Sequence, residues 1–444
     1  MGKVILFLVI IFLSILFFYK KNSYVYALMF FYLILPEYCA LSIGNNLPTL
    51  TASRCLLILF IITTIIEKKN LKINVLKRTN SYKYFIIFFI CETIVFLKHV
   101  NVTEHVKEYL GILLENFIFL LLLVTYIDSR EKVEKFIKML VFLATIVGIF
   151  SIFEVISGIN ISNFLNTGVN TSIINVAYER LNINRATFSL GHPICLAIFM
   201  GMLLPIIIYR INIFNERYLK FVLIIVLLTI FLTISRGPII IIALFLMYMF
   251  LLMNSKEKNK YIVIIFFSIL ILIVGILANE NISNIFLGTI KSIFREIGFE
   301  IEVDNFGGNT NGTDSRLRQW TALPEVLKKY PLCGGGSYFI FRNQVPYTRA
   351  NGAIAYLRSI DCEYLSLLIN KGILGFIGIM FFYLGILNIS IKKPKSSLLK
   401  YLSYSYCIAL ACYVTVCQLT TFKMFWTIIS LIIIEKSLIL RKEN

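Results

Sequence analysis

Long apolar runs, separated by short polar stretches, fill most of the 444 residues of the chain. Each run has about 17–25 residues, the length that a helix needs to cross a hydrocarbon core of about 30 Å. The pattern predicts about thirteen membrane-spanning helices, or about twelve if the short first run is left out. We expect them at residues 4–19, 24–43, 50–66, 82–98, 109–127, 134–157, 192–210, 218–235, 237–253, 261–278, 364–391, 400–420 and 424–440.

The composition agrees with this pattern. Hydrophobic residues make up 58% of the chain and charged residues only 15%, whereas a soluble protein has about 25% charged residues. So much apolar surface could not be covered in water. We therefore predict an all-α polytopic membrane protein, with residues 1–444 forming a single integral membrane domain.

One long polar segment, residues 279–363, interrupts the apolar runs, and a second loop covers residues 158–191. The short loops rich in Lys and Arg alternate along the chain with the remaining loops, which include these two, residues 98–108 and the turn at 235–238. The positive-inside rule places the basic loops and the C-terminus in the cytoplasm and both longer loops on the outer side of the membrane. The net charge of +19 is thus explained by topology, and we expect no nucleic-acid partner.

The long loop has recognisable local structure. Thr313 or Asp314 is expected to cap a helix that runs to about residue 330, and Pro324 either interrupts it or starts a second helix. One face of this helix would carry the apolar side chains of Leu317, Trp320, Leu323 and Leu327.

Other parts of the loop carry weaker signals. Residues 282–297 have amphipathic spacing and are expected on the membrane surface. The glycines at 334–336 exclude a helix and indicate a flexible or tightly turned backbone. Cys333 and Cys362 could form a disulfide if the loop faces an oxidising space.

Arg236 is the sharpest candidate for function, because it lies between two apolar runs in Ser235-Arg236-Gly237. A charge buried in a bilayer costs about 2.5–3.5 kcal/mol on insertion scales. A guanidinium suits a phosphate ligand, although snorkelling to the interface would also explain it. Arg185 lies just before the predicted span at 192–210. It could act as a second phosphate ligand or be an ordinary loop arginine. Arg180 is a weaker candidate.

Three other groups of residues could bind sugar or move a proton. Arg316 and Arg318 precede Trp320, an arrangement that suits a sugar-phosphate site or a helix packed on the membrane domain. Asp361 and Glu363 could accept a proton from a sugar hydroxyl, or they could simply favour a helix N-terminus. His192 could carry a proton or begin a helix.

The remaining polar signals are interpreted as structural. The intramembrane acids Glu37, Glu92, Glu115 and Glu154 lie near span ends or among polar neighbours. No sequence with metal-ligand spacing or a nucleotide-binding loop occurs. We therefore expect neither a metal nor another cofactor.

Taken in order, these residues resemble the bacterial O-antigen ligase/polymerase family of membrane glycosyltransferases. The resemblance covers roughly residues 180–380, and its individual motifs are short. They are Arg185-Ala186-Thr187-Phe188, Gly191-His192-Pro193, Ser235-Arg236-Gly237, Ser315-Arg316 with Trp320, Pro331 to Gly336, Asp361 to Leu365, and Gly372 to Gly375.

The resemblance implies a GT-C-like helical fold in the bacterial plasma membrane. The substrates would be undecaprenyl-diphosphate-linked oligosaccharides at the outer face. Arg236, Arg316 and Arg185 would hold the diphosphate. A flippase and a chain-length regulator are conceivable protein partners.

The chain differs from the ligases of the family at one position, and this difference favours one of the family's two reactions. Ligases of the family carry a His just before the last group of spans, where this chain has Asp361. The sequence therefore predicts a polymerase of O-antigen or capsule polysaccharide. A ligase that transfers finished glycan, a transporter of lipid-linked sugars, and a sensor or scaffold stay open as alternatives.

Overall fold

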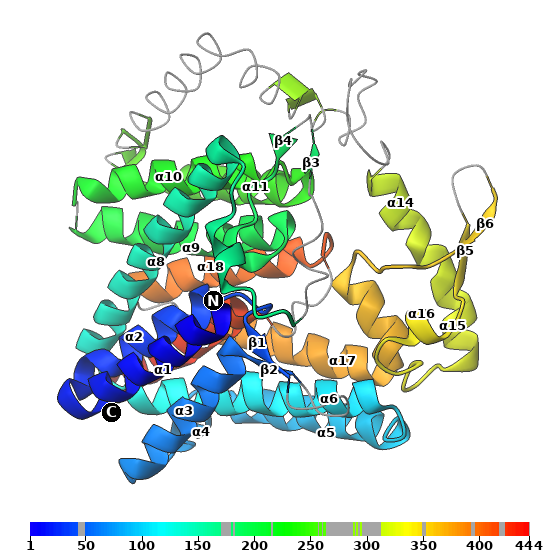
Figure 1. Ribbon diagram of the computed structural model, residues 1–444, viewed down its shortest axis with the longest axis horizontal. Helices are drawn as coiled ribbons and strands as arrows, with labels where there is room; N and C mark the ends of the chain where they lie inside the picture. The colour runs from blue at the N-terminus through cyan, green and yellow to red at the C-terminus, as the bar shows by residue number, and fades with distance from the viewer. Residues whose placement is uncertain are drawn as a thin grey trace.

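The computed structural model describes residues 1–443 apart from residues 43–48, 170–178, 181–182, 215, 256, 260, 263–286, 289, 292–293, 295–311, 349–351, 392–395 and 417–421. Most of the described residues are helical (Figure 1). The helices are α1 (Gly2–Tyr19), α2 (Lys21–Ile34), α3 (Ala52–Ile66), α4 (Asn74–Arg78), α5 (Tyr82–Lys98), α6 (Thr103–Gly111), α7 (Phe119–Tyr126), α8 (Arg130–Ser157), α9 (Pro193–Phe214), α10 (Tyr218–Leu232), α11 (Arg236–Leu251), α14 (Gly312–Gln319), α15 (Leu323–Lys329), α16 (Phe339–Arg342), α17 (Glu363–Ile391), α18 (Ser397–Cys412) and α19 (Lys423–Glu443).

Short elements complete the described chain. A π-helical turn, Ile112–Ile118, joins α6 and α7 into one continuous helix. Three antiparallel strand pairs occur: β1 (Ala40–Leu41) with β2 (Leu50–Thr51), β3 (Glu179–Arg180) with β4 (Ile183–Asn184), and β5 (Pro346–Thr348) with β6 (Ile354–Tyr356). Single 3-10 turns cover Ile161–Leu165, Phe188–Leu190 and Trp320–Ala322.

The helices fall where the apolar runs predicted them, so the chain is an all-α polytopic membrane protein. Among the described residues, five helices have the length and apolar composition to cross a membrane: Gly2–Tyr19, Thr103–Tyr126, Arg130–Ser157, Pro193–Phe214 and Glu363–Ile391. The run at 24–43 is helical only to Ile34, because Leu35 precedes a proline and is extended. The predicted span at 261–278 and the amphipathic segment at 282–297 lie largely outside the described residues.

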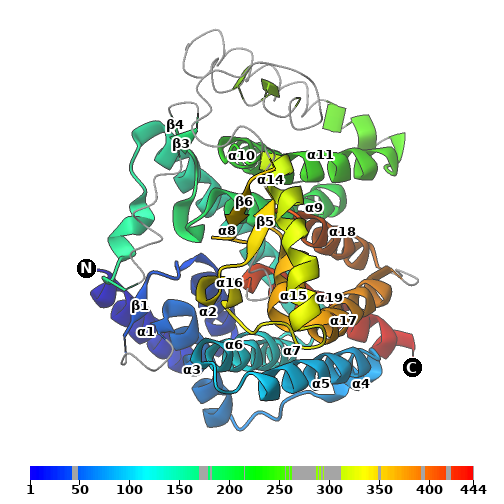
Figure 2. The same cartoon turned by 90° about the vertical axis from the view of Figure 1, so that its right-hand side faces the viewer.

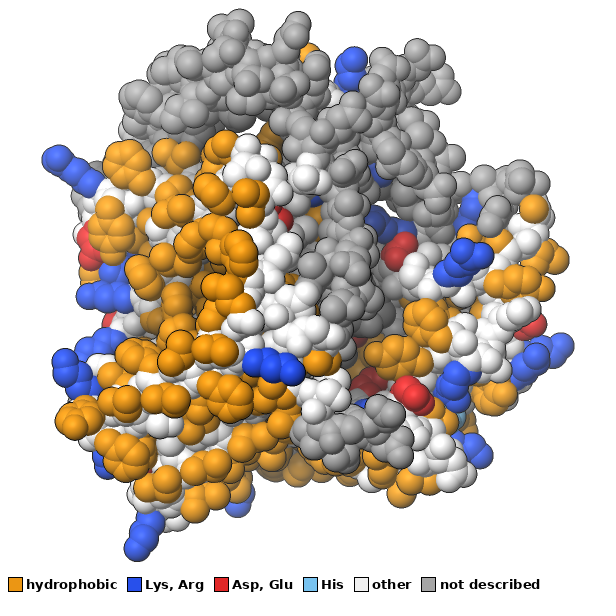
Figure 3. Space-filling model, viewed as in Figure 1, with side chains coloured by type: hydrophobic (Ala, Val, Ile, Leu, Met, Phe, Trp, Pro, Cys, Tyr) orange, Lys and Arg blue, Asp and Glu red, His pale blue; other side chains and the backbone are white. Residues whose placement is uncertain are grey.

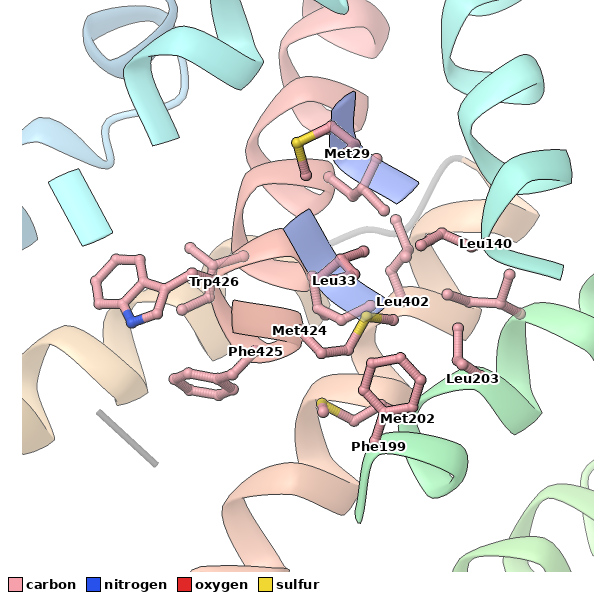
Figure 4. Close-up of a cluster of buried hydrophobic side chains, with 14 of the residues drawn as sticks. Met29, Leu33, Leu140, Phe199, Met202, Leu203, Leu402, Met424, Phe425 and Trp426 are labelled. Atoms are coloured by element: carbon pink, nitrogen blue, oxygen red, sulfur yellow. The ribbon is translucent and has the colours of Figure 1, made fainter. Parts of the chain in front are cut away.

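The helical body has one large hydrophobic core. Side chains from α2, α8, α9, α18 and α19 meet in its middle (Figure 4), among them the buried Leu33, Leu140, Phe199, Leu402 and Phe425. Hydrophobic side chains also cover much of the surface of the helical body, whereas Lys and Arg gather at its left-hand edge (Figure 3). An apolar surface of this kind fits a lipid environment.

The described residues of 312–362 form a lobe at one end of the helical body (Figures 1 and 2). It contains α14, α15, α16, β5 and β6. A second, smaller core holds it together, and this core includes Leu365 and Ile369 from the first part of α17. Leu367, in the same part of α17, belongs to the core of the helical body, so this part of α17 bridges the two cores.

The sequence predicted the helices of the lobe better than their buried face. A helical segment does begin near Thr313, and Pro324 does start a second helix, α15. Of the expected apolar face, Leu323 packs against the core of the lobe, whereas Leu317 and Trp320 are 64% and 36% exposed. The buried positions are instead Gln319, Ala322 and Val326, since Gln319 has a polar partner within the lobe. Cys333 and Cys362 are free thiols.

The lobe joins the helical body through a break in α17. Gly372 has a non-helical backbone there, with φ +65°. The backbone N–H groups of Gly335 and Gly336 donate to the carbonyls of Ile369 and Asn370, each at 2.9 Å. In return, residues 373 and 374 donate to the carbonyls of residues 331 and 332. The lobe thus supplies the backbone partners that the broken helix lacks.

The triple glycine is required by this close approach. A Cβ on Gly334 would lie 2.5 Å from the backbone nitrogen of Gly372. A Cβ on Gly372 would lie 2.4 Å from the backbone nitrogen of Gly334. Both residues also have positive φ, which glycine adopts without steric cost.

Asp128, between α7 and α8, provides a test of stability outside the spans. Its carboxylate lies 2.5 Å from Lys72 Nζ and 2.7 Å from Lys132 Nζ. Burial acts to raise the pKa of Asp128, but hydrogen bonds and charge from the two lysines outweigh it and lower the pKa to about 2.

Because the unfolded pKa of Asp is about 3.9, the lysine contacts of Asp128 stabilise the fold above that pH. This contribution is lost as the pH falls toward 2. We expect Asp128→Asn to make the thermal midpoint of the detergent-solubilised protein less sensitive to acidification from about pH 5 to about pH 3. Identical pH dependence in both proteins would contradict this assignment.

Candidate functional site

Arg185 reaches the turn between α10 and α11. Its side chain is buried, and its Nε donates to the carbonyl of Thr233 at 2.7 Å. Its Nη2 donates to the hydroxyl of Ser235 at 2.8 Å. The two motifs that carry Arg185 and Arg236 are therefore in direct contact, although about fifty residues separate them in the sequence.

Glu154, near the end of α8, holds the segment that carries Arg185. One carboxylate oxygen accepts the backbone N–H groups of Thr187 and Phe188 at 2.9 and 2.7 Å. The other accepts the Thr187 hydroxyl at 2.7 Å and the Asn160 amide at 2.8 Å. These contacts support the structural interpretation of Glu154, since they fix the backbone beside Arg185.

Arg236 is the first residue of α11 and is buried. A helix N-terminus carries a partial positive charge, so an arginine placed there raises an already positive potential. Cations are unfavourable at such a position, whereas an oxyanion is favoured by both the arginine and the helix. Together with Arg185, Arg236 makes this corner of the helical body suited to an anionic ligand.

The turn after α18 brings the beginning of α17 to the same corner. A Cβ on Gly237 would lie 2.6 Å from the Cγ2 atom of Thr415, so Gly237 packs directly against this turn. The backbone N–H of Glu363 donates to the carbonyls of Tyr413 and Val416 at 2.9 and 3.0 Å. The Arg236 motif and the Asp361–Glu363 motif thus both contact the same turn, residues 413–416.

Asp361 is tied to the helix that carries the lobe arginines. The backbone N–H of Asp361 donates to the side-chain oxygen of Gln319 at 3.1 Å, and the Gln319 amide donates back to the carboxylate at 3.4 Å. The hydroxyl of Ser359 donates to the other carboxylate oxygen at 3.3 Å. These donors orient the Asp361 carboxylate.

Arg316 and Arg318 precede Gln319 on α14. Burial raises the pKa of the Cys362 thiol, and the charges of Glu363 and Arg316 act on that thiol in opposite directions. Arg316 is therefore within electrostatic reach of Cys362. The structure brings together Arg316, Asp361 and Glu363 on one side and Arg185 and Arg236 on the other.

The other predicted site residues are placed differently. Nδ1 of His192 accepts the backbone N–H of Ile194 at 3.1 Å, at the start of α9. Trp320 lies at the lobe surface. Arg180 lies in β3, and its side chain is outside the described part of the structure. Among the described residues, no group of three or more His, Cys, Asp and Glu side chains could hold a metal ion.

Several residues that support the site were not singled out from the sequence. Gln319 and the turn at 413–416 contribute hydrogen bonds that no motif reveals, and Ser235 was noted only as the neighbour of Arg236. Lys371 was also missed, although a lysine within the predicted span 364–391, with Glu92 inside another span, indicates a buried ion pair. That signal was available in the sequence.

The helical fold defines a polytopic membrane protein, and its corner at the start of α11 contains two buried arginines, Arg185 and Arg236. Residues 221–380 match the family model described as O-Antigen ligase. The match includes Arg236, Arg316 and Asp361, and it supports the predicted resemblance to the O-antigen ligase/polymerase family over these residues. No curated protein matches the chain.

The role of Glu154 can be tested through the accessibility of Arg185 to trypsin. Glu154→Ala leaves several buried donors without their acceptor, at a cost of about 1–3 kcal/mol each. We therefore expect cleavage after Arg185 to accelerate about tenfold or more in the solubilised protein, as measured by mass spectrometry. Glu131→Ala, at the exposed start of the same helix, is the matched control. Equal cleavage rates in Glu154→Ala and the parent would refute this role.

Proposed function

We propose that this protein is a polysaccharide polymerase of the bacterial plasma membrane. It would transfer a glycan from undecaprenyl diphosphate onto the sugar of a second lipid-linked repeat unit. The polymer would be an O-antigen or a capsule polysaccharide. The proposed orientation places the lobe outside the cell and the C-terminus in the cytoplasm, following the basic loops.

The observation that carries this proposal is the contact between the Arg185 and Arg236 motifs at the start of α11. A diphosphate carries several negative charges at adjacent oxygens, and guanidinium groups bind such oxygens with paired hydrogen bonds. Both arginines are buried, so their charge is screened less than it would be in water. A fixed positive site of this kind stabilises charge that develops in a transition state.

The proposed reaction is a displacement at the anomeric carbon of the donor sugar. A hydroxyl of the acceptor sugar forms the new glycosidic bond, while the bond from that carbon to the diphosphate oxygen breaks. The electron pair leaves with undecaprenyl diphosphate, whose added negative charge is stabilised by Arg236, Arg185 and Arg316. The hydroxyl proton passes to a carboxylate.

Asp361 is the proposed proton acceptor. Its carboxylate is half-buried and oriented by Gln319 and Ser359. Glu363 is the second candidate, although its side chain is more deeply buried. Arg318 and Trp320, at or near the surface of the lobe, would contact the sugars of the glycan rather than the diphosphate.

The ligase reaction is the second candidate function, since it uses the same leaving group and the matched family is described as O-Antigen ligase. The two reactions differ only in the acceptor. Asp361 at the position where ligases carry His favours the polymerase. A flippase and a chain-length regulator are the protein partners that a polymerase would need in the cell.

Arg236→Ala tests the proposal in cells that lack the chromosomal copy. We expect surface glycan to fall about 100-fold or more, because one preorganised donor contributes about that factor to catalysis. The glycan ladder on a gel should collapse to a single repeat unit, with protein amount checked by immunoblot. Arg217→Ala, an exposed arginine at the opposite end of α10, should leave the ladder unchanged.

The length of lipid-linked glycan in the same cells separates the alternatives. Single lipid-linked units indicate a polymerase, whereas long lipid-linked chains that never reach a final acceptor indicate a ligase. An unchanged ladder in Arg236→Ala cells would remove the catalytic assignment and favour a scaffold.

A further inference from the structure

A cluster of buried charges lies beside the break in α17. Lys371 and Glu92 are each 2% exposed, and Lys371 Nζ lies 2.9 and 3.1 Å from the two Glu92 carboxylate oxygens. Glu108, on α6, lies 3.3 Å from the same ammonium group. Lys371 therefore links α17 to two other helices through charge-assisted contacts.

The cluster continues into the lobe. The hydroxyl of Ser337, which is buried, donates to the carboxylate of Glu108. Nδ1 of His105 lies 2.7 Å from the same hydroxyl oxygen. Nε2 of His99 donates to the carbonyl of Cys333 at 3.1 Å. Polar contacts thus join the helical body to the lobe immediately beside its triple glycine.

This position matters because the candidate site is shared between the two parts. Arg185 and Arg236 belong to the helical body, whereas Arg316 and Asp361 belong to the lobe. The two parts have separate hydrophobic cores, and the first part of α17 contributes to both, with Leu365 and Ile369 in the core of the lobe and Leu367 in that of the helical body. Contacts at the α17 break therefore influence how the lobe half of the site faces the helical half.

The energetic cost of the Lys371 cluster also indicates that it positions the lobe and does not only stabilise the fold. Burying Lys371 and Glu92 costs desolvation energy that well-packed apolar side chains would not cost, and Glu108 is partly exposed. In return, moving the lobe away from the helical body would leave buried charges without their partners, so the contact resists displacement. A purely apolar joint would tolerate sliding more readily.

We propose that Lys371 is a positioning residue, which fixes the lobe on the helical body and so places Asp361 opposite Arg236. This inference rests on the proposed function for its effect on glycan transfer. The docking of the lobe at Lys371 can be tested without any activity.

Cys333 provides the probe of docking, because it lies in the docked segment and is partly exposed. Its rate of reaction with a membrane-impermeant maleimide is measured on the full-length protein, with Cys333→Ser defining the background. We expect Lys371→Met to raise the labelling rate about tenfold and to reduce the glycan ladder at normal protein level. Lys371→Arg should retain both properties, because it keeps the charge.

Lys329→Met, on the exposed surface of α15, is the matched control and should change neither readout. Ser337→Ala is the second variant in case Lys371→Met does not accumulate, since it removes only one hydroxyl between the lobe and Glu108. It should raise labelling by a smaller factor and weaken the ladder.

Unchanged labelling in both variants would overturn the proposal, even if Arg236→Ala abolishes the glycan. Faster labelling with a normal ladder would also overturn it, because the joint would then not place the site. If Arg236→Ala leaves the ladder intact, the proposed function fails, whereas the labelling rates still decide whether Lys371 fixes the lobe.

Discussion

A broken helix inside an apolar body must find partners for its freed backbone groups, since lipid offers none. Around Gly372 these partners come from residues 331–336, more than thirty residues upstream. The backbone exchange requires glycine at 334 and at 372, because no Cβ fits there. The lobe is therefore hydrogen-bonded to the backbone of α17 at its break, and these hydrogen bonds fix the position of the lobe.

Charged side chains in the helical body also need polar partners, because lipid offers none. Glu92 pairs with Lys371, and Glu115 lies 2.5 Å from Nε of Arg54. Glu154 uses its carboxylate to order a loop rather than to meet a cation. These acids stabilise contacts between helices and loops of the helical body. Arg236 instead adds positive charge at a helix N-terminus, which is already positive. This unfavourable placement of charge distinguishes the candidate site from the structural polar groups around it.

Much of this architecture could be predicted from residue patterns. The apolar runs located the helices, because length and apolarity are local properties of the chain. Pro324 marked the start of α15, since proline suits the first turn of a helix. The candidate arginines could be chosen because a charge between two apolar runs is costly. Lys371 and Glu92 carried the same signal, yet their pairing could not be known.

Tertiary contacts decided the rest. The sequence by itself determined the helical membrane fold, the long polar interruption and the residue types available for anion binding. Only the structure decided that Arg185 meets Ser235, that Gln319 holds Asp361, and that His192 accepts a hydrogen bond at the start of α9. It also decided that Gln319, and not Leu317, is buried. The physical reason is that burial and hydrogen bonding depend on partners distant in sequence, which local apolar periodicity does not encode.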